Sequence, residues 1–317
     1  MMKKILESNI EWQAPALSDQ IQCGDMPGDK VNISEDAIMK AETIFKELLR
    51  DIPELLATRQ NERVVLTVCG GSGVGKSSIA SLLAYYFNQL SIDCYTLSGD
   101  NYPKRIPMYN DAERLRIFRN GGIQSLLASG EYSKERFQVL HKLQEEGKDA
   151  DPAYEIEHPW LKTYHVGGRK AFSEYLGTDK EQDFEQLGNI VSQFKEGKEK
   201  IWLKRMGRKD TELWYDEITF QPASILIIEW THGNSDYYDG VDIPILLNST
   251  PQETLAYRMA RSRDGQVDSP FTTMVLEIEQ GLLDSQAKKA KIILSKQGEL
   301  LDYSQYKKLM NDAKGEE

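Results

Sequence analysis

A glycine-rich stretch near residue 70 has the residue types that suit binding of a phosphate chain. Residues 64–78 read VVLTVCGGSGVGKSS and contain the pattern G-x-x-x-x-G-K-[ST]. Glycines let the backbone wrap closely around an anion, so that successive N–H groups point inward. The lysine of this pattern reaches the β- and γ-phosphates, and the hydroxyl after it ligates Mg²⁺. The residues predicted to bind nucleotide phosphates are Gly70, Gly71, Ser72, Gly73, Val74, Gly75, Lys76, Ser77 and Ser78.

The segments on either side of this loop supply the context that the pattern requires. Residues 64–68 form an apolar run rich in β-branched residues, which is typical of a buried parallel strand. A helix that begins at the loop places the positive end of its dipole against the anion. Such a helix is indicated by apolar residues at helical spacing, namely Ile79, Leu82, Leu83, Tyr86, Phe87 and Leu90. This context favours a phosphate site over a glycine turn with a purely structural role.

Two acidic residues follow two further predicted strands. Residues 93–97 lead into Asp100, and residues 224–228 lead into Glu229. Ligands in open α/β sheets lie beyond the carboxyl ends of the strands, so Asp100 is expected to face the phosphate site. A carboxylate after a buried strand is a second signature of phosphate-loop enzymes, so Glu229 is expected to hold Mg²⁺ together with Ser77. A surface turn for Asp100, and a neutral cap or salt bridge for Glu229, are the alternatives.

Three arginines lie within six residues of a predicted helix that begins at Pro251. They are Arg258, Arg261 and Arg263, and they follow the strand predicted at residues 243–248. Arginine suits bidentate contact with phosphate oxygens. We therefore expect Arg258 and Arg263 to contact the nucleotide and Arg261 to act on the transferring group. A solvated helix face is the alternative.

A second group of basic residues, called here the basic cluster, consists of Lys204, Arg205, Arg208 and Lys209. The chain as a whole is acidic, with a formal net charge of -11, so a local positive field would attract an anion. Arg205 and Arg208 are therefore predicted to bind an anionic group on the substrate. The alternative is a solvated hairpin tip.

Composition excludes several classes of function. The chain has 317 residues, of which 40% are hydrophobic and 28% charged, as expected for a soluble globular protein with room for one large α/β domain. Its negative charge disfavours extended nucleic-acid or anionic-membrane binding. The N-terminus lacks the apolar core of a signal peptide, and no apolar run approaches the roughly 20 residues of a membrane span. We expect a cytoplasmic protein with a small-molecule substrate, and homo-oligomer formation is left open.

The remaining segments are predicted to flank or interrupt this domain. Residues 1–60 are expected to be a partly helical N-terminal extension that packs over the core, with a partner-binding or regulatory arm as the alternative. Residues 61–302 are expected to form the catalytic domain, with an insertion at 103–182. The irregular, aromatic-rich part of this insertion, 149–165, is a candidate substrate lid, because long irregular segments are often functional. Residues 303–317 are expected to be a polar tail.

The order of these motifs resembles the uridine kinase and phosphoribulokinase group of phosphate-loop kinases. The similar parts cover roughly residues 62–102 and 184–295, through GGSGVGKSS, SGDNY, FEQLGNIVSQFKEGKEK, ILIIEWTHG and TLAYRMARSRDG. The resemblance implies a P-loop NTPase fold, that is, a mostly parallel α/β sheet with helices on both faces. It also implies ATP- and Mg²⁺-dependent phosphorylation of a hydroxyl on a small metabolite. In that group the residue matching Asp100 is the base toward the substrate hydroxyl, and the segment matching 258–263 is a lid over ATP.

Tyr102, in the same SGDNY motif, is predicted to contact the acceptor. The chain departs from uridine kinases at residues 202–205, where WLKR replaces an aromatic-and-aspartate segment for the nucleoside. Residues 103–182 are also longer than a uridine kinase needs. A sugar phosphate or another anionic acceptor is therefore at least as plausible as a nucleoside.

Two interpretations from other classes remain. A GTPase-like switch is disfavoured because the sequence has no N-K-x-D guanine motif. A degenerate kinase fold that serves as a scaffold is disfavoured because Lys76, Ser77, Asp100 and Glu229 are all intact.

Overall fold

The computed structural model describes residues 1–18, 21–59, 61–261 and 269–315. The chain divides into two compact units. Unit 1 consists of Met1–Tyr102, Phe184–Tyr257 and Leu282–Glu317, and unit 2 consists of Pro103–Asp183 and Arg258–Gly281. The insertion predicted at 103–182 coincides closely with the first segment of unit 2, while its role as a lid stays a prediction.

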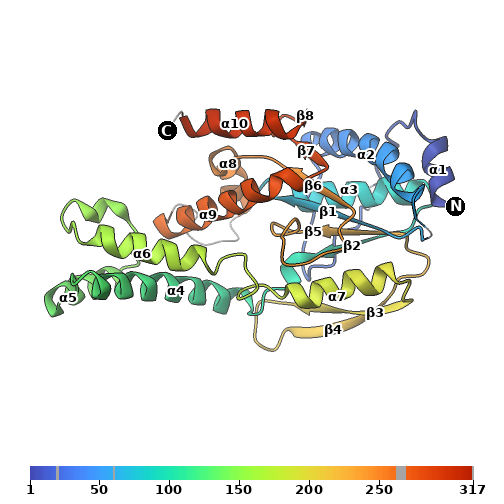
Figure 1. The fold of residues 1–317 in the computed structure, drawn as a ribbon. Helices are drawn as coiled ribbons and strands as arrows, with labels where there is room; N and C mark the ends of the chain where they lie inside the picture. The colour runs from blue at the N-terminus through green and yellow to red at the C-terminus, as the bar shows by residue number, and fades with distance from the viewer. Residues whose placement is uncertain (19–20, 60, 262–268, 316–317) are drawn as a thin grey trace. The chain divides into compact units, whose positions relative to one another are not determined.

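The centre of unit 1 is a six-stranded sheet with the strand order β2-β5-β1-β6-β7-β8 (Figure 1). All neighbouring strands pair in parallel except β7 and β8, which are antiparallel. The strands are β1 (Val64–Gly70), β2 (Cys94–Ser98), β5 (Ile225–Glu229), β6 (Ile243–Leu247), β7 (Ile292–Leu294) and β8 (Leu300–Leu301). Every residue of β1 and β5 is buried, which explains their mostly apolar composition, with Thr67 in β1 and Glu229 at the end of β5 as the polar residues. The mostly parallel α/β sheet expected from the sequence is confirmed.

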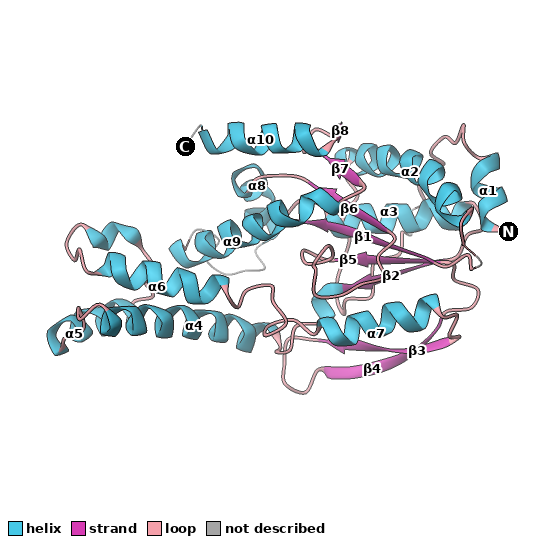
Figure 2. Cartoon of the chain, viewed as in Figure 1, coloured by secondary structure: helices cyan, strands magenta, loops and turns pink. Residues whose placement is uncertain are grey.

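Helices cover both faces of this sheet, as Figure 2 shows. The helices of unit 1 include α1 (Met2–Ser8), α2 (Glu35–Leu56), α3 (Lys76–Gln89), α7 (Phe184–Lys195) and α10 (Tyr303–Gly315). Because side chains alternate along a strand, Val64 and Leu66 pack in the cluster formed with α2 and α3, whereas Val65 packs in the cluster formed with α7. The second cluster also includes residues of an antiparallel hairpin, β3 (Lys200–Met206) and β4 (Leu213–Thr219).

The N-terminal segment before β1 and the last described residues both contain helices. Helix α2 begins after Ser34, whose Oγ accepts a hydrogen bond from the Ala37 N–H at 3.2 Å, and it buries one face against the core. The sequence predicts a polar tail at residues 303–317, and the described part of this segment, Tyr303–Gly315, forms α10. This helix buries Tyr306 and Met310, two apolar contacts that its otherwise polar composition conceals.

Unit 2 is helical, with α4 (Pro107–Ala128), α5 (Lys134–Glu145), α6 (Leu161–Ser173) and the first part of α9 (Pro270–Gln286). Helices α4 and α6 approach closely because Gly121 has no side chain: a Cβ there would lie 2.8 Å from the Gly167 carbonyl oxygen. The segment expected to be irregular, 149–165, is in part α6, because helix begins at Leu161 and buries Tyr164. Among the described residues, no helix combines the length and the apolar composition that crossing a bilayer requires.

Candidate active site

The phosphate loop joins β1 to α3 at the carboxyl end of the sheet. Gly73 and Gly75 have φ angles of 83° and 90°, in the left-handed region that favours glycine. A Cβ at Gly70 would lie 2.6 Å from the Leu247 carbonyl oxygen, so the strand also needs glycine where it meets β6. Helix α3 begins at Lys76, so its unpaired N–H groups lie at the loop. The predicted phosphate-binding residues thus form one continuous loop and first helical turn.

Lys76 and Ser78, on either side of Ser77 in this turn, donate hydrogen bonds to main-chain carbonyls. The Lys76 Nζ donates to the Gly71 carbonyl oxygen at 3.0 Å, which curls the side chain over the loop. The Ser78 Oγ donates to the Asn32 carbonyl oxygen at 3.0 Å, so the N-terminal segment lies against the start of α3.

Glu229 ends β5, between β2 and β1, at the carboxyl edge of the sheet. Parallel pairing places its Cα opposite Val68 of β1 on one side and Ser98 of β2 on the other. The Ser77 Oγ donates to its Oε1 at 3.1 Å, and the Ser98 Oγ to its Oε2 at 3.4 Å. The structure therefore brings together the two residues predicted to hold Mg²⁺, although the metal role itself stays a prediction.

The surroundings of Glu229 make its negative charge costly. Burial raises the pKa of Glu229 to about 7, and the nearby carboxylates of Asp100 and Asp29 raise it as well. The Lys76 ammonium and the hydrogen bond from Ser77 lower this pKa but do not cancel the rise. A divalent cation at this position would favour the ionised carboxylate.

The donor atoms at this position suit Mg²⁺. Ser77 and Glu229 offer hard oxygen atoms, which Mg²⁺ prefers, and Mg²⁺ usually takes one or two carboxylates and completes its shell with phosphate oxygens and water. Throughout the part of the chain that the structure describes, no group of three or more His, Cys, Asp or Glu side chains is arranged to hold a metal alone. The oxygen atoms of Ser77 and Glu229 fit a Mg²⁺ ion whose remaining ligands are polyphosphate oxygens and water.

Asp100 is exposed in a short 3₁₀ turn, Gly99–Asn101, directly after β2. The turn is tightly constrained, because a Cβ at Gly99 would lie 2.0 Å from Cγ of Trp230. On its other side, the Asn101 Oδ1 accepts a hydrogen bond from the Met206 N–H of β3 at 3.0 Å. Asp100 is thus an exposed carboxylate on a fixed turn, close enough to Glu229 to raise the pKa of that residue.

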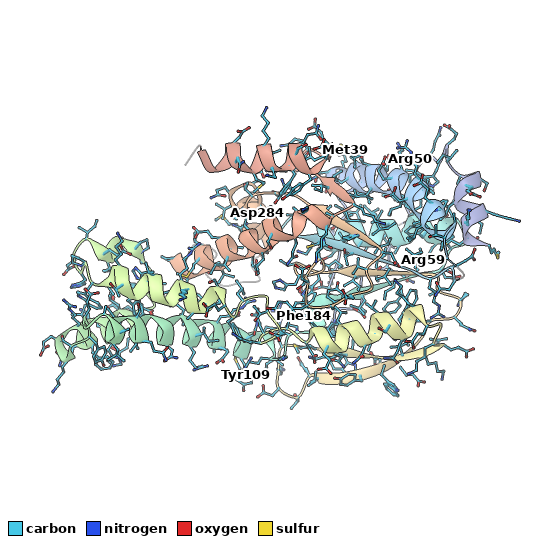
Figure 3. All side chains as sticks on the ribbon, in the orientation of Figure 1. Met39, Arg50, Arg59, Tyr109, Phe184 and Asp284 are labelled. Carbon is cyan, nitrogen blue, oxygen red and sulfur yellow. The ribbon has the colours of Figure 1, made fainter. Side chains whose placement is uncertain are left out.

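The predicted contact of Tyr102 with the acceptor is not supported. Its side chain is fully buried in the apolar cluster that contains Leu203 and Phe184, the latter labelled in Figure 3. Burial raises the pKa of the Tyr102 hydroxyl, as expected for a phenol removed from water. The sequence could not distinguish an aromatic residue that follows a catalytic turn from one that anchors it.

The basic cluster is not one surface. Lys204 and Arg205 are buried, whereas Arg208 and Lys209 are exposed. Arg205 forms ion pairs with Asp25 at 2.9 Å and with Asp216 at 3.1 Å, so two carboxylates compensate its charge. The hairpin-tip interpretation therefore applies only to its exposed half, and Arg205 offers an anionic acceptor less attraction than the sequence indicated.

The predicted arginine lid can be followed only in part. Arg258 and Arg261 lie in α8 (Pro251–Arg261), and Arg263 lies outside the described residues. Their contact with a nucleotide stays a prediction.

Sequence reasoning missed Asp25. It belongs to a turn-rich loop, where aspartate is usually a turn former. In the structure its Oδ1 accepts a hydrogen bond from the Ser98 N–H at 2.6 Å, at the end of the strand that precedes Asp100. No local pattern could reveal this contact, because the two residues are 73 positions apart.

The chain is similar to part of a curated relative and, in fold, to solved structures. No protein-family model matches the chain. Over 240 residues, or 76% of its length, the chain is 37% identical to the bifunctional alpha-galactosidase/sucrose kinase AgaSK of Mediterraneibacter gnavus. The match covers 21% of that protein, so the chain spans about a fifth of the length of the curated relative it matches.

Solved structures resemble the chain in fold at low sequence identity. D-glycerate 3-kinase from Cryptococcus neoformans var. grubii has a TM-score of 0.50 and 10% identity, covering 84% of this chain and 98% of that one. The YGR205w protein has a TM-score of 0.48 and 10% identity, covering 83% and 96%. The phosphate loop, the parallel strand order and the likeness to the glycerate kinase together show that the chain has the P-loop kinase fold that its motifs predicted.

Proposed function

We propose that the chain is an ATP- and Mg²⁺-dependent kinase that phosphorylates a hydroxyl group of a small sugar. The observation that carries the proposal is the meeting of Ser77 and Glu229 at the carboxyl edge of the sheet, with Lys76 beside them. Phosphoryl transfer needs positioning and charge neutralisation more than covalent chemistry, and these groups supply both.

Each residue has a role in this proposal. Lys76 and the loop N–H groups neutralise charge on the phosphates, and Ser77 and Glu229 hold the Mg²⁺. The chemistry that Mg²⁺ supplies when bound is neutralisation of the β- and γ-phosphate oxygens. Asp100 accepts the proton of the acceptor hydroxyl as that oxygen bonds to the γ-phosphorus and ADP leaves. Arg258, Arg261 and Arg263 are proposed to cover the transferring group and exclude water.

A neutral sugar is the proposed acceptor class, with sucrose as the first candidate. Two observations support it. The relative with 37% identity is described as a sucrose kinase as well as an alpha-galactosidase. The present chain carries the phosphate loop that a kinase needs. Arg205, a buried arginine near the Asp100 turn, is compensated by Asp25 and Asp216, so its guanidinium offers little uncompensated positive charge to select an anion.

An acceptor panel tests the proposal. The purified full chain is incubated with ATP and Mg²⁺ and with sucrose, fructose, glucose, fructose 6-phosphate, glycerate or uridine in turn. ADP release and the mass of the product are measured. We expect ADP release that depends on Mg²⁺ and on a neutral sugar, with a product one phosphoryl group heavier. Preferred use of glycerate, fructose 6-phosphate or uridine would contradict the sugar assignment, and ADP release without any acceptor would contradict the kinase assignment.

A further inference from the structure

The N-terminal segment of unit 1 places a buried carboxylate under the turn that carries Asp100. The Asp25 side chain is 8% exposed. Its Oδ1 accepts hydrogen bonds from the Ser98 N–H at 2.6 Å and from the Asn101 Nδ2 at 3.2 Å. Its Oδ2 accepts hydrogen bonds from the Tyr95 hydroxyl at 3.0 Å and from the Arg205 guanidinium at 2.9 Å.

These partners bracket Asp100 in the chain. Ser98 ends β2 two residues before Asp100, and Asn101 follows it directly. Asp25 is therefore one group that fixes both the entry to the turn, through a main-chain N–H, and its exit, through a side-chain amide. Asn101 also connects the turn to β3, because its Oδ1 accepts a hydrogen bond from the Met206 N–H.

Burial of the Asp25 carboxylate costs free energy, which a residue that only formed a surface turn would not incur. Burial raises the pKa of Asp25, and the Arg205 guanidinium and the Ser98 N–H lower it without cancelling the rise. Without the carboxylate, the Ser98 N–H and the Asn101 amide would lose their shared acceptor. An aspartate that only formed a surface turn would stay exposed to water.

We propose that Asp25 is a positioning residue for phosphoryl transfer, which fixes the turn at residues 98–101 so that the Asp100 carboxylate meets the acceptor hydroxyl. The inference rests on the proposed kinase function and on the role of Asp100 in it. It gives the N-terminal segment a part in the active site, beyond packing over the core.

A mutant cycle tests this role. The variants are Asp25→Ala, Asp25→Asn, Asp100→Asn and the double variant Asp25→Ala/Asp100→Asn. Ser34→Ala is the control, because it removes the N-cap of α2 in the same N-terminal segment without touching the turn. For each full-length protein, Tm, kcat per folded enzyme, and KM for ATP and for sucrose are measured.

If Asp25 acts through Asp100, its effect disappears when Asp100 is already inactive. We expect Asp100→Asn to lower kcat by about 10²-fold or more, within the range for a general base. Asp25→Ala should lower kcat by about 10- to 100-fold, since misplacing a reacting group by about 1 Å costs up to that much, with KM for ATP unchanged. The double variant should be no slower than Asp100→Asn alone.

The remaining variants separate positioning from general stability. Asp25→Asn keeps one oxygen for the Ser98 N–H and should lose less activity than Asp25→Ala. Ser34→Ala should lower Tm but not kcat per folded enzyme. If Asp25→Ala does not fold, the same cycle is run with Asp25→Asn.

Two outcomes would overturn the inference. In one, the kcat losses of Asp25 and Asp100 variants multiply, which means that they act independently. In the other, Asp25→Ala behaves like Ser34→Ala, with lower Tm and unchanged kcat. Failure of the wild-type protein to phosphorylate any acceptor contradicts the proposed function itself, so the two failures are distinguishable.

Discussion

The Ser77 Oγ lies 3.1 Å from Oε1 of Glu229, although 152 residues separate the two along the chain. Two features produce this contact. The phosphate loop connects β1 to α3, so Ser77 lies in the first turn of α3. Parallel pairing of β5 with β1 places Glu229, the last residue of β5, opposite Val68. The geometry of the site is thus built into the order and register of three neighbouring elements.

Loss of the Lys76 ammonium should abolish phosphoryl transfer without unfolding the protein. The Lys76 Nζ donates to the Gly71 carbonyl in the loop, and among the described residues Lys76 is not part of the apolar core, so Lys76→Ala should leave Tm nearly unchanged. Lys296→Ala is a matched control, since it also removes a lysine that donates to a main-chain carbonyl, that of Glu253. Turnover near the wild-type rate in Lys76→Ala would contradict the phosphate-loop assignment.

A methyl group at Gly99 should distort the turn that carries Asp100. The added Cβ would overlap the Trp230 ring, and overpacking of this kind typically costs about 1–3 kcal/mol. We expect Gly99→Ala to lower both Tm and kcat. Gly281→Ala is the control: a Cβ there meets nothing within 4 Å, so Tm should rise or stay the same. Equal behaviour of the two variants would show that the turn tolerates the change.

The raised pKa of Glu229 predicts how stability depends on pH. The folded protein keeps a proton on Glu229 up to about pH 7, whereas the unfolded chain releases it near the ordinary value of 4.5. The contribution of this group to stability is therefore present below the unfolded pKa and is lost as pH rises through the folded pKa. Tm of the ligand-free protein should fall, relative to Glu229→Gln, between about pH 5 and about pH 8. Parallel Tm curves for the two proteins would contradict this prediction.

The strands, the phosphate loop and the carboxylate that ends β5 could be predicted because local patterns determine them. A buried parallel strand leaves a continuous apolar run, and Glu229 is simply the residue at which that run ends. The sheet then gathers the strand ends at one edge, whatever the loops between them contain.

The partners of Arg205 could not be predicted, because they depend on tertiary contacts. Asp25 lies 180 residues away, in a loop without helical or strand periodicity. A basic run looks the same in sequence whether its charges face water or buried carboxylates. The same limit applies to Tyr102, whose aromatic ring could have faced either the acceptor or the core.

The exposed half of the basic cluster allows a direct test of acceptor charge. Arg208 can be changed without breaking the buried pair of Arg205 with Asp25, so Arg208→Gln isolates surface charge. For a neutral sugar acceptor, KM should stay unchanged and kcat/KM should depend little on salt. The hypothesis of an anionic acceptor bound by Arg205 and Arg208 predicts the opposite. KM for the acceptor should then rise in Arg208→Gln and rise further in the double variant Arg205→Gln/Arg208→Gln, while KM for ATP stays constant.

The most direct test of the kinase account is ³¹P NMR of the full-length protein with ATP, Mg²⁺ and sucrose. The account predicts a new phosphate-ester signal that grows in step with ADP, requires both Mg²⁺ and the sugar, and is absent with Lys76→Ala. A spectrum in which ATP yields only ADP and inorganic phosphate at the same rate with and without sucrose and the other acceptors would contradict it.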